Sequence, residues 1–312
     1  MLSNWRQGAL LDATQLTTYE KSWLQLQPFL LANGLQLRRR YQPGWVPSWN
    51  DDTLPEPGRP EDSIIPRNKN FIDAVRVSTG ERVGLKLVEL DEELGAQELE
   101  IIQYLSRGEV RNDPRNPCIP LLDILDPPTH PNQRLLVMPL LYEVMGPLFK
   151  SVSECEGFVG QILRGMEFLH RHKIAHKDIC PHNLVMKAPG LYPKGCHPMD
   201  NLMTEDGSSY SDIRRLHKET RLFRGRYRDL PEYERPGPWD GYKIDVYCLG
   251  LLIDERVVKR CRHVHFLKPL VEWMTRNEPS ERPTAQQAVE WFNTATSRPK
   301  FRRALSRVFA FL

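Results

Sequence analysis

The segment HKDICPHN, His176 to Asn183, brings together side chains that could do chemistry. The carboxylate of Asp178 could orient a hydroxyl group for attack, and the side-chain oxygen of Asn183 could hold a metal ion. Transfer of a phosphoryl group needs both functions. The alternative interpretation is a turn that ends a helix and contains an aspartate and an asparagine by chance.

Helices on both sides of this segment would position it. Ser151 and Glu154 have the spacing of a capping box, and the following residues up to His172 carry an apolar face, which predicts a helix leading into HKDICPHN. Downstream, DVYCLGLLIDERVV is apolar nearly all round, which predicts a helix buried at the centre of a helical unit. Two shorter helices are expected near residues 267–274 and 285–292.

The first half of the chain has the pattern of a small sheet. FIDAVRV and RVGLKLV are rich in β-forming residues and are joined by a turn that contains Gly80, which predicts a hairpin. A helix is expected over residues 92–105. CIPLLDIL and RLLVMPLL then predict two further strands, separated by a proline-rich turn.

The residues before this sheet look different. Thr17 and Glu20 form a capping-box pair, and the apolar residues that follow predict a helix that ends near Gly34. The next stretch is dense in proline, glycine and aspartate, which predicts an extended arm. We therefore expect four segments: a helix and arm over 1–60, a β-rich lobe over 61–140, a helical lobe over 141–297, and a basic tail over 298–312.

Composition excludes several classes of protein. The 312 residues carry a formal net charge of +3, with 27% charged and 40% hydrophobic residues, as in ordinary globular proteins without general nucleic-acid affinity. No run approaches the roughly 18 apolar residues of a membrane helix. The N-terminus lacks the features of a signal peptide, which predicts a location in the cytoplasm or nucleus.

The six cysteines lie far apart in the sequence and form no CxxC pair. We therefore interpret them as reduced thiols. Cys261 lies near His263 and His265, but this alternating spacing is expected by chance more often than in a metal site.

Several motifs together resemble those of protein kinases. HKDICPHN resembles their catalytic loop, which reads His-Arg-Asp, four residues, then Asn. KIDVYCLG resembles the start of the central kinase helix, and NEPSERPTAQQAV resembles a family segment that ends in Arg-Pro-Thr. The resemblance covers residues 71–292 and implies an α+β, two-lobed fold with a small β-rich N-lobe and a larger helical C-lobe. LYPKG, after the catalytic loop, is similar to divergent fungal kinase-like proteins.

This resemblance implies roles for particular residues. Asp178 would be the catalytic base and Asn183 the magnesium ligand. Lys86, in TGERVGLK, would contact the phosphates of ATP and pair with Glu98 on the following helix, with Glu100 as the alternative. The remaining nucleotide contacts would come from Met138 and Leu140.

Two structural roles are implied as well. Asp245 would accept hydrogen bonds from the backbone of the catalytic loop, although an aspartate there could also be a helix N-cap. Arg282 would pair with Glu232 in DLPEY, the expected counterpart of the Ala-Pro-Glu motif.

The chain also departs from the family pattern. SIIPRNKN, before the first predicted strand, contains no glycine for a phosphate-binding loop, although Arg67 and Lys69 could compensate by charge. Cys180 stands where kinases acting on Ser or Thr usually have lysine. No Asp-Phe-Gly motif lies between Asn183 and Glu232, where Asp200, Asp206, Asp212 and Asp229 are the aspartates available. The loss could be genuine, or the sequence could come from a shortened transcript.

Two functions follow as expectations. The first is ATP-dependent and Mg²⁺-dependent phosphoryl transfer to a Ser or Thr of an unknown protein, with weak or lost activity. The alternative is an inactive pseudokinase that acts as a binding scaffold for a protein partner. The basic tail is expected to form a helix with solvated arginines, and an amphipathic anchor for an anionic membrane or an acidic partner is the alternative.

Overall fold

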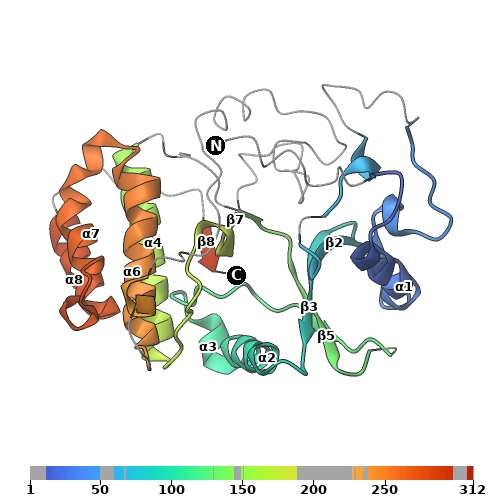
Figure 1. Cartoon of the computed structure of the whole chain (residues 1–312), viewed down its shortest axis with the longest axis horizontal. Helices are drawn as coiled ribbons and strands as arrows, with labels where there is room; N and C mark the ends of the chain where they lie inside the picture. Colours follow the sequence, from blue (N-terminus) through green and yellow to red (C-terminus); the bar gives the residue numbers. More distant parts are fainter. Residues whose placement is uncertain are drawn as a thin grey trace. The chain divides into compact units, whose positions relative to one another are not determined.

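The computed structural model describes residues 12–49, 60–66, 68–128, 130–143, 149, 151–187, 227, 230–234, 238–297 and 308–311. The chain forms two compact units, both visible in Figure 1. The first contains the N-terminal part up to Ala96 together with Leu121–Leu140, and the second contains Gln97–Pro120 and the helical part that follows. Among the described helices, none combines the length and the apolar character that a membrane crossing requires.

A five-stranded antiparallel sheet forms the centre of the first unit. Its strands follow the order β1 (Leu35–Leu37), β2 (Phe71–Arg76), β3 (Arg82–Glu89), β5 (Gln133–Pro139) and β4 (Asp123–Leu125). β2 and β3 form the predicted hairpin, and Gly80 in its turn has a φ of +71°, which glycine adopts without strain. β1 was not predicted, because three residues are too few for an alternating pattern to be recognised.

The register of the strands gives this sheet two different faces. Residues directly opposite each other in an antiparallel pair point to the same side of the sheet. The pairs Phe71–Lys86 and Asp73–Gly84 of β2 and β3 therefore share one face, which we call the lysine face. The residues between them point to the other face.

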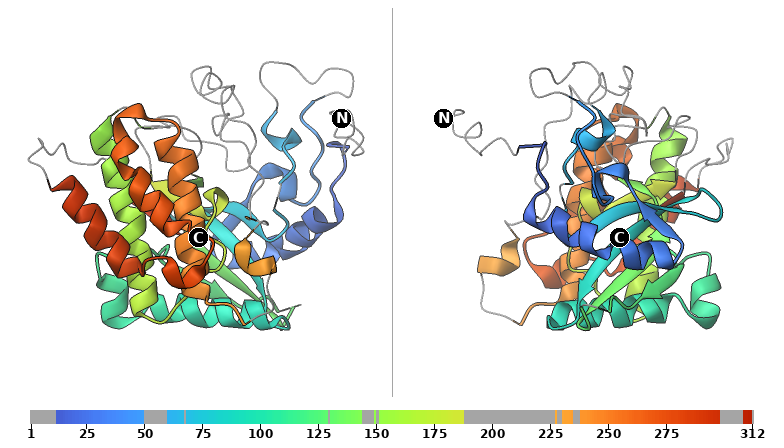
Figure 2. Two further views of the ribbon diagram at one scale, coloured as in Figure 1. Left: turned by 60° about the vertical axis from the view of Figure 1, so that its left-hand side comes forward. Right: turned by 90° about the vertical axis from the view of Figure 1, so that its right-hand side faces the viewer.

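Helix α1 (Thr18–Ala32) packs on that other face, as Figures 1 and 2 show. The predicted capping box of Thr17 and Glu20 is confirmed, and the helix contains Pro28 without ending there. Its apolar side chains and those of the sheet form one buried cluster: Trp23, Leu26, Leu30, Leu35, Leu37, Tyr41, Ile72, Ala74, Val83, Leu85, Leu135 and Val137. The N-terminal helix therefore completes the core of the first unit.

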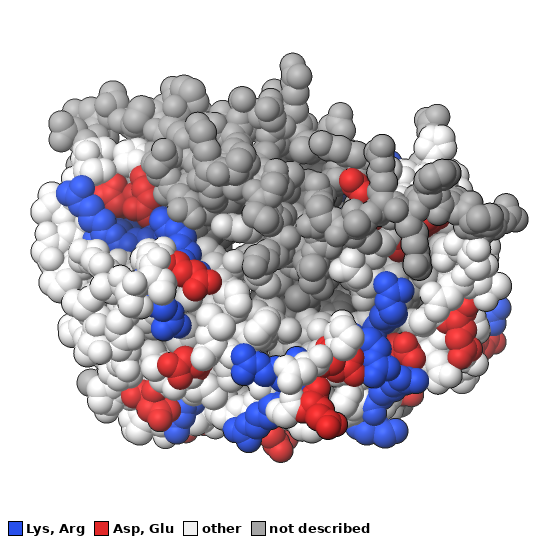
Figure 3. Space-filling view, turned by 180° about the vertical axis from the view of Figure 1, so that it is seen from behind, with Lys and Arg blue, Asp and Glu red and all other residues white. Residues whose placement is uncertain are grey.

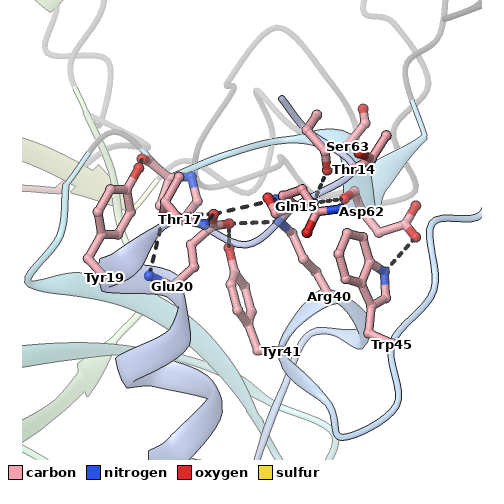
Figure 4. Close-up of polar contacts among 12 residues, drawn as sticks. Thr14, Gln15, Thr17, Tyr19, Glu20, Arg40, Tyr41, Trp45, Asp62 and Ser63 are labelled. Atoms are coloured by element: carbon pink, nitrogen blue, oxygen red, sulfur yellow. Dashed lines mark hydrogen bonds and ion pairs between the residues drawn. The ribbon is translucent and has the colours of Figure 1, made fainter. Parts of the chain in front are cut away.

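A buried ion pair ties α1 to the chain that follows β1 (Figure 4). The Arg40 guanidinium donates to the Glu20 carboxylate over 2.7 Å, and to the backbone oxygens of Ala13 and Gln15 over 2.7 and 2.9 Å. The Tyr41 hydroxyl donates to the same Glu20 carboxylate over 3.2 Å. Burial, and then the negative charge of Glu20, raise the pKa of Tyr41 above its usual value, so this hydroxyl stays a donor.

The same arginine also holds part of the predicted arm. Arg40 donates to the backbone oxygen of Asp62 over 2.8 Å and lies over the ring of Trp45, 4.5 Å from its centre. The Asp62 carboxylate in turn accepts from Trp45 Nε1 over 2.9 Å and from the Ser48 hydroxyl over 2.6 Å. Trp45 and Ser48 of the arm are therefore bound to the first unit by contacts with the buried residues Arg40 and Asp62.

Four helices form the core of the second unit: α4 (Val152–Arg171), α6 (Gly241–Ile253), α7 (Lys268–Met274) and α8 (Ala285–Thr296). They match the predicted helices, and α6 is buried on most of its surface, as expected from its apolar sequence. Figure 1 shows α4 and α6 side by side. α6 continues as one wider turn, η5 (Asp254–Val258). α2 (Glu93–Leu105) and α3 (Gly108–Asn112) precede these helices in the chain.

A small antiparallel sheet lies next to α4 and has the order β6 (Tyr142–Glu143), β7 (Leu184–Lys187) and β8 (Val308–Phe311). The expected helix is wrong for the described part of the tail, because Val308–Phe311 forms a strand paired with β7. Valine and phenylalanine favour strands, and the edge of β7 offers backbone partners. The arginines of the tail, from Arg298 to Arg307, lie outside the described residues.

The surface carries charges of both signs. In Figure 3, Lys and Arg side chains lie between Asp and Glu side chains across the described part of the face shown. Interspersed charges of this kind are typical of globular surfaces.

Candidate functional site

The segment His176–Asn183 lies between α4 and β7 in the second unit. Two residues near the start of this loop have positive φ values. Lys173, just after α4, has a φ of +62°, and Lys177, the second residue of the segment, has a φ of +61°. Positive φ costs free energy at residues other than glycine, and such residues are concentrated at functional sites. Contacts with the surroundings must therefore hold this loop in its conformation.

Asp245 provides the main contacts of this kind. Its carboxylate accepts hydrogen bonds of 2.7 Å from the backbone N–H groups of His176 and Lys177 and lies 3.0 Å from Nε2 of His170. Asp245 is buried, with 1% exposure, inside α6. The predicted role of Asp245 is confirmed, whereas the N-cap of α6 is Asp240.

The structure brings Asp178 and Asn183 together. Nδ2 of Asn183 donates to the backbone oxygen of Asp178 over 2.8 Å and to its carboxylate Oδ2 over 2.9 Å. Both side chains are half-buried. The amide holds the carboxylate in one orientation, as the positioning of a hydroxyl group requires.

This loop fits a magnesium ion only in part. Mg²⁺ prefers an octahedron of oxygens, usually from one or two carboxylates with phosphates and water. Asp178 offers one carboxylate and Asn183 one amide oxygen, and in the part of the chain that the structure describes no three His, Cys, Asp or Glu side chains gather as a metal site. The aspartates considered for the absent motif lie outside the described residues: Asp200, Asp206, Asp212 and Asp229. The described ligands therefore do not make a magnesium site by themselves.

A second buried contact fixes the start of α6 to the segment before α8. Arg282 and Glu232 form the predicted bidentate pair, in which Nη1 contacts Oε1 and Nη2 lies 3.2 Å from Oε2. The exposed fractions of these side chains are 0% and 3%. Arg282 also donates to the backbone oxygen of Lys243 in α6 over 3.0 Å and lies 4.4 Å from the ring centre of Tyr247. We interpret this pair as structural, because both side chains are buried and the charge of each is neutralised by the other.

Lys86 lies on β3 of the first unit, opposite Phe71 in β2 and Leu136 in β5. Met138 is buried on the same lysine face, and Leu140 follows the end of β5. Their contact with a nucleotide stays a prediction.

Glu98 lies on α2, as expected from the helix predicted after β3. It belongs to the second unit, whereas Lys86 belongs to the first. The pairing of Lys86 with Glu98 therefore stays a prediction, and so do the catalytic roles of both residues.

Sequence reasoning missed a group of charged residues on the lysine face, which we call the Asp73 cluster: Arg38, Glu61, Asp73 and Arg82. Asp73 has 0% side-chain exposure and accepts from Arg38 Nε over 2.8 Å and from Arg82 Nη1 over 2.9 Å. Arg38 Nη1 lies 2.7 Å from Glu61. Burial acts to lower the pKa of Arg38, but Asp73 and Glu61 more than offset this effect and raise it. An aspartate in the middle of the strand FIDAVRV was the available signal, because a buried carboxylate needs a cationic partner.

Comparisons with known proteins agree with the resemblance. No protein-family model matches the chain. It is 23% identical over 223 residues to mitogen-activated protein kinase 1 of Oryza sativa subsp. japonica, covering 66% of this chain and 52% of the relative. It is 25% identical over 125 residues to mitogen-activated protein kinase 4a of Physcomitrium patens, covering 35% of this chain and 31% of the relative. It is 26% identical over 102 residues to mitogen-activated protein kinase sma-5 of Caenorhabditis elegans, covering 33% of this chain and 20% of the relative.

The chain thus spans about half or less of the length of these curated relatives. The distant similarity supports a relationship to the protein kinase superfamily. Together with the five-stranded antiparallel sheet and the helical region that follows it, this similarity identifies the fold as α+β and kinase-like, with two lobes. No fungal relationship is shown.

Proposed function

We propose that this chain is a kinase-like binding module for a protein partner, without phosphoryl-transfer activity of its own. The observation that carries the proposal is the buried Asp73 cluster on the lysine face. By resemblance, this face would receive the nucleotide. A nucleotide base needs flat apolar surface there, as ligand sites generally do.

Two features of the lysine face disfavour such a contact. The buried carboxylate of Asp73 lies opposite Gly84, two residues along β3 from Lys86. Arg38 and Arg82 already pair with this carboxylate. The ring of Phe71 leans over Gly84, because a Cβ atom at Gly84 would lie only 2.8 Å from it. The side chains of Phe71 and Asp73 therefore fill the lysine face beside Lys86.

The catalytic loop supports the same proposal. Its described ligands are too few for Mg²⁺, and losing one electrostatic contact to the charge that develops in transfer costs roughly 3 kcal/mol, or about a hundredfold in rate. The contacts of Asp245 and of Arg282 with Glu232 stabilise the helical unit without touching a substrate. They would be retained in a protein that uses the fold for binding alone.

A phosphoryl-transfer assay tests the proposal. With ATP, Mg²⁺ and a generic protein substrate, we expect the same background incorporation of labelled phosphate from the wild-type chain and from Asp178→Ala, because no reaction depends on the carboxylate. Arg39→Ala, at an exposed position of the first unit, is the control for preparation effects. Incorporation by the wild type and Arg39→Ala that Asp178→Ala abolishes would contradict the proposal.

One observation favours the second candidate, an active kinase. Asn183 orients the Asp178 carboxylate over 2.9 Å, as a residue that positions a hydroxyl would require. In that case ATP and Mg²⁺ are the cofactors, Lys86 and Glu98 position the phosphates, and a protein Ser or Thr is the acceptor. The Asp178→Ala comparison separates the two candidates.

A further inference from the structure

The strand β8 covers one edge of β7 in the second unit, and Figure 1 shows the two strands side by side. β7 is the central strand of the small sheet, with β6 on one side and β8 on the other. β6 pairs with Val185 and Met186, whereas β8 pairs with every residue of β7 from Leu184 to Lys187. One short segment from a distant part of the chain therefore covers the whole length of this edge.

The residues of β7 need such a cover, because they are apolar and lie in the core. Leu184, Val185 and Met186 are buried, and Leu184 and Met186 belong to the apolar cluster that also contains residues of α4. β8 itself contacts α4. Without β8, this edge would present unpaired backbone N–H and C=O groups next to an apolar core, which is a template for another strand. The edge of β7 is therefore suited to binding a strand.

The pairing defines the kind of segment that fits this edge. The strands are antiparallel, and the register places Phe311 opposite Leu184 and Phe309 opposite Met186. Directly opposed residues in an antiparallel pair share one side of the sheet. Any strand bound in this register therefore places every second residue on the side of Leu184 and Met186, so apolar residues fit at those two positions. The backbone bonds provide affinity, and these two positions provide the specificity.

We propose that the edge of β7 is a binding site for an extended segment of a partner protein with apolar residues at alternate positions, and that β8 occupies this site until the partner displaces it. Addition of a strand to a sheet edge is a recurring mode of peptide recognition. β8 is a suitable element to be displaced, because it is short and lies at the outer position of its sheet. Short peripheral elements open at a lower cost than core elements.

The connection of β8 to the rest of the chain favours a partner protein over a second copy. Residues 297–307 join α8 to β8, so β8 competes for the edge as a tethered strand, at an effective concentration of roughly millimolar. A second copy of this chain would offer the same strand without the tether. A partner segment that binds more tightly than β8 can displace it, whereas the β8 of another copy has no such advantage.

This inference names the kind of partner for the proposed binding module, and it rests on that function only in expecting a protein. The site uses the backbone of β7 and neither the lysine face nor the Asp178 carboxylate. Peptide binding and phosphoryl transfer are therefore separate measurements. A failure to bind peptide would leave the expected result for Asp178→Ala unchanged.

The test uses the full chain and a fluorescent peptide of residues 302–312, with binding followed by anisotropy. The double variant Phe309→Pro with Ala310→Pro removes the tethered competitor. Proline cannot donate to the ladder, and one of two adjacent residues directs its N–H group to the neighbouring strand. We expect this variant to bind the peptide about tenfold more tightly than the wild type. The matched control, Phe309→Leu with Ala310→Ser, keeps both N–H groups and should bind like the wild type.

Two results would overturn the proposal. The first is a double proline variant with native far-UV circular dichroism that binds the peptide no more tightly than the wild type. The second is a wild type that is a dimer in sedimentation velocity and that the two prolines convert into a monomer, because the edge would then belong to a second copy.

Hydrogen exchange of the wild type decides if the double variant does not fold. This experiment uses the peptide with the Ala310→Ser change, whose fragments differ in mass from those of the chain. At millimolar peptide, we expect faster exchange of the amides of Val308–Phe311, because β8 is displaced, and continued protection of β7, because the peptide takes its place. Unchanged exchange of Val308–Phe311 would contradict the proposal.

Discussion

Replacing Arg282 with alanine is expected to lower the free energy of unfolding of the second unit by about 3–5 kcal/mol. The change would leave the Glu232 carboxylate buried at 3% exposure without its cationic partner. It would also remove the donors to the backbone oxygens of Arg276 and Lys243, at 2.6 and 3.0 Å. Hydrogen exchange of the α6 amides measures this effect in the second unit alone.

The matched control for this prediction is Arg276→Ala. Arg276 lies close in sequence, but its side chain is 52% exposed and lies 3.4 Å from Glu281. Exposed ion pairs contribute about 0–1 kcal/mol, so exchange of the α6 amides should change little. Equal protection of α6 in Arg282→Ala and Arg276→Ala would show that the buried pair does not stabilise the helical unit.

Replacing Arg40 with alanine is expected to have a similar effect on the first unit, about 3–5 kcal/mol. Glu20 has 0% exposure, and its carboxylate would keep the Tyr41 hydroxyl at 3.2 Å and the N–H and hydroxyl of the N-cap Thr17 at 2.8 Å, none of which carries a positive charge. The backbone oxygens of Ala13, Gln15 and Asp62 would lose their donor. Because α1 covers one face of the sheet, we expect faster hydrogen exchange in β1 and β2 and an earlier urea transition in tryptophan fluorescence.

Arg39→Ala is the control here, because the neighbouring Arg39 is exposed. A double variant, Glu20→Leu with Arg40→Met, sharpens the test. The backbone oxygens of Ala13, Gln15 and Asp62 lose their donor in both variants, but the double variant leaves no unpaired buried charge, so it should be more stable than Arg40→Ala. A double variant less stable than Arg40→Ala would mean that the cost comes from lost packing rather than from the unpaired carboxylate.

Much of the fold could be predicted because its signals are local. Capping residues and apolar side chains were sufficient for α1 and α4, and the hairpin of β2 and β3 followed from β-forming residues around Gly80. The edge strands β1 and β8 could not be predicted in the same way. Each is three or four residues long and exists because a distant strand offers it a free edge.

The same difference between local signals and contacts of distant segments applies to the candidate site. The contacts of Asp245 with the loop backbone and of Arg282 with Glu232 were expected, because motifs fix the position of each partner in the sequence. The Asp73 cluster was missed. Its members come from segments without a motif, and the pairing of the strands brings them together.

Thermal stability with and without ATP and Mg²⁺ tests the proposed binding module most directly. A ligand at one hundred times its Kd adds about 2.7 kcal/mol to the stability of the folded protein, which shifts the melting temperature by several degrees. Because the Asp73 cluster and Phe71 fill the lysine face beside Lys86, we predict no shift at millimolar nucleotide. A rise in melting temperature that requires both ATP and Mg²⁺, and that Lys86→Met abolishes, would contradict the account.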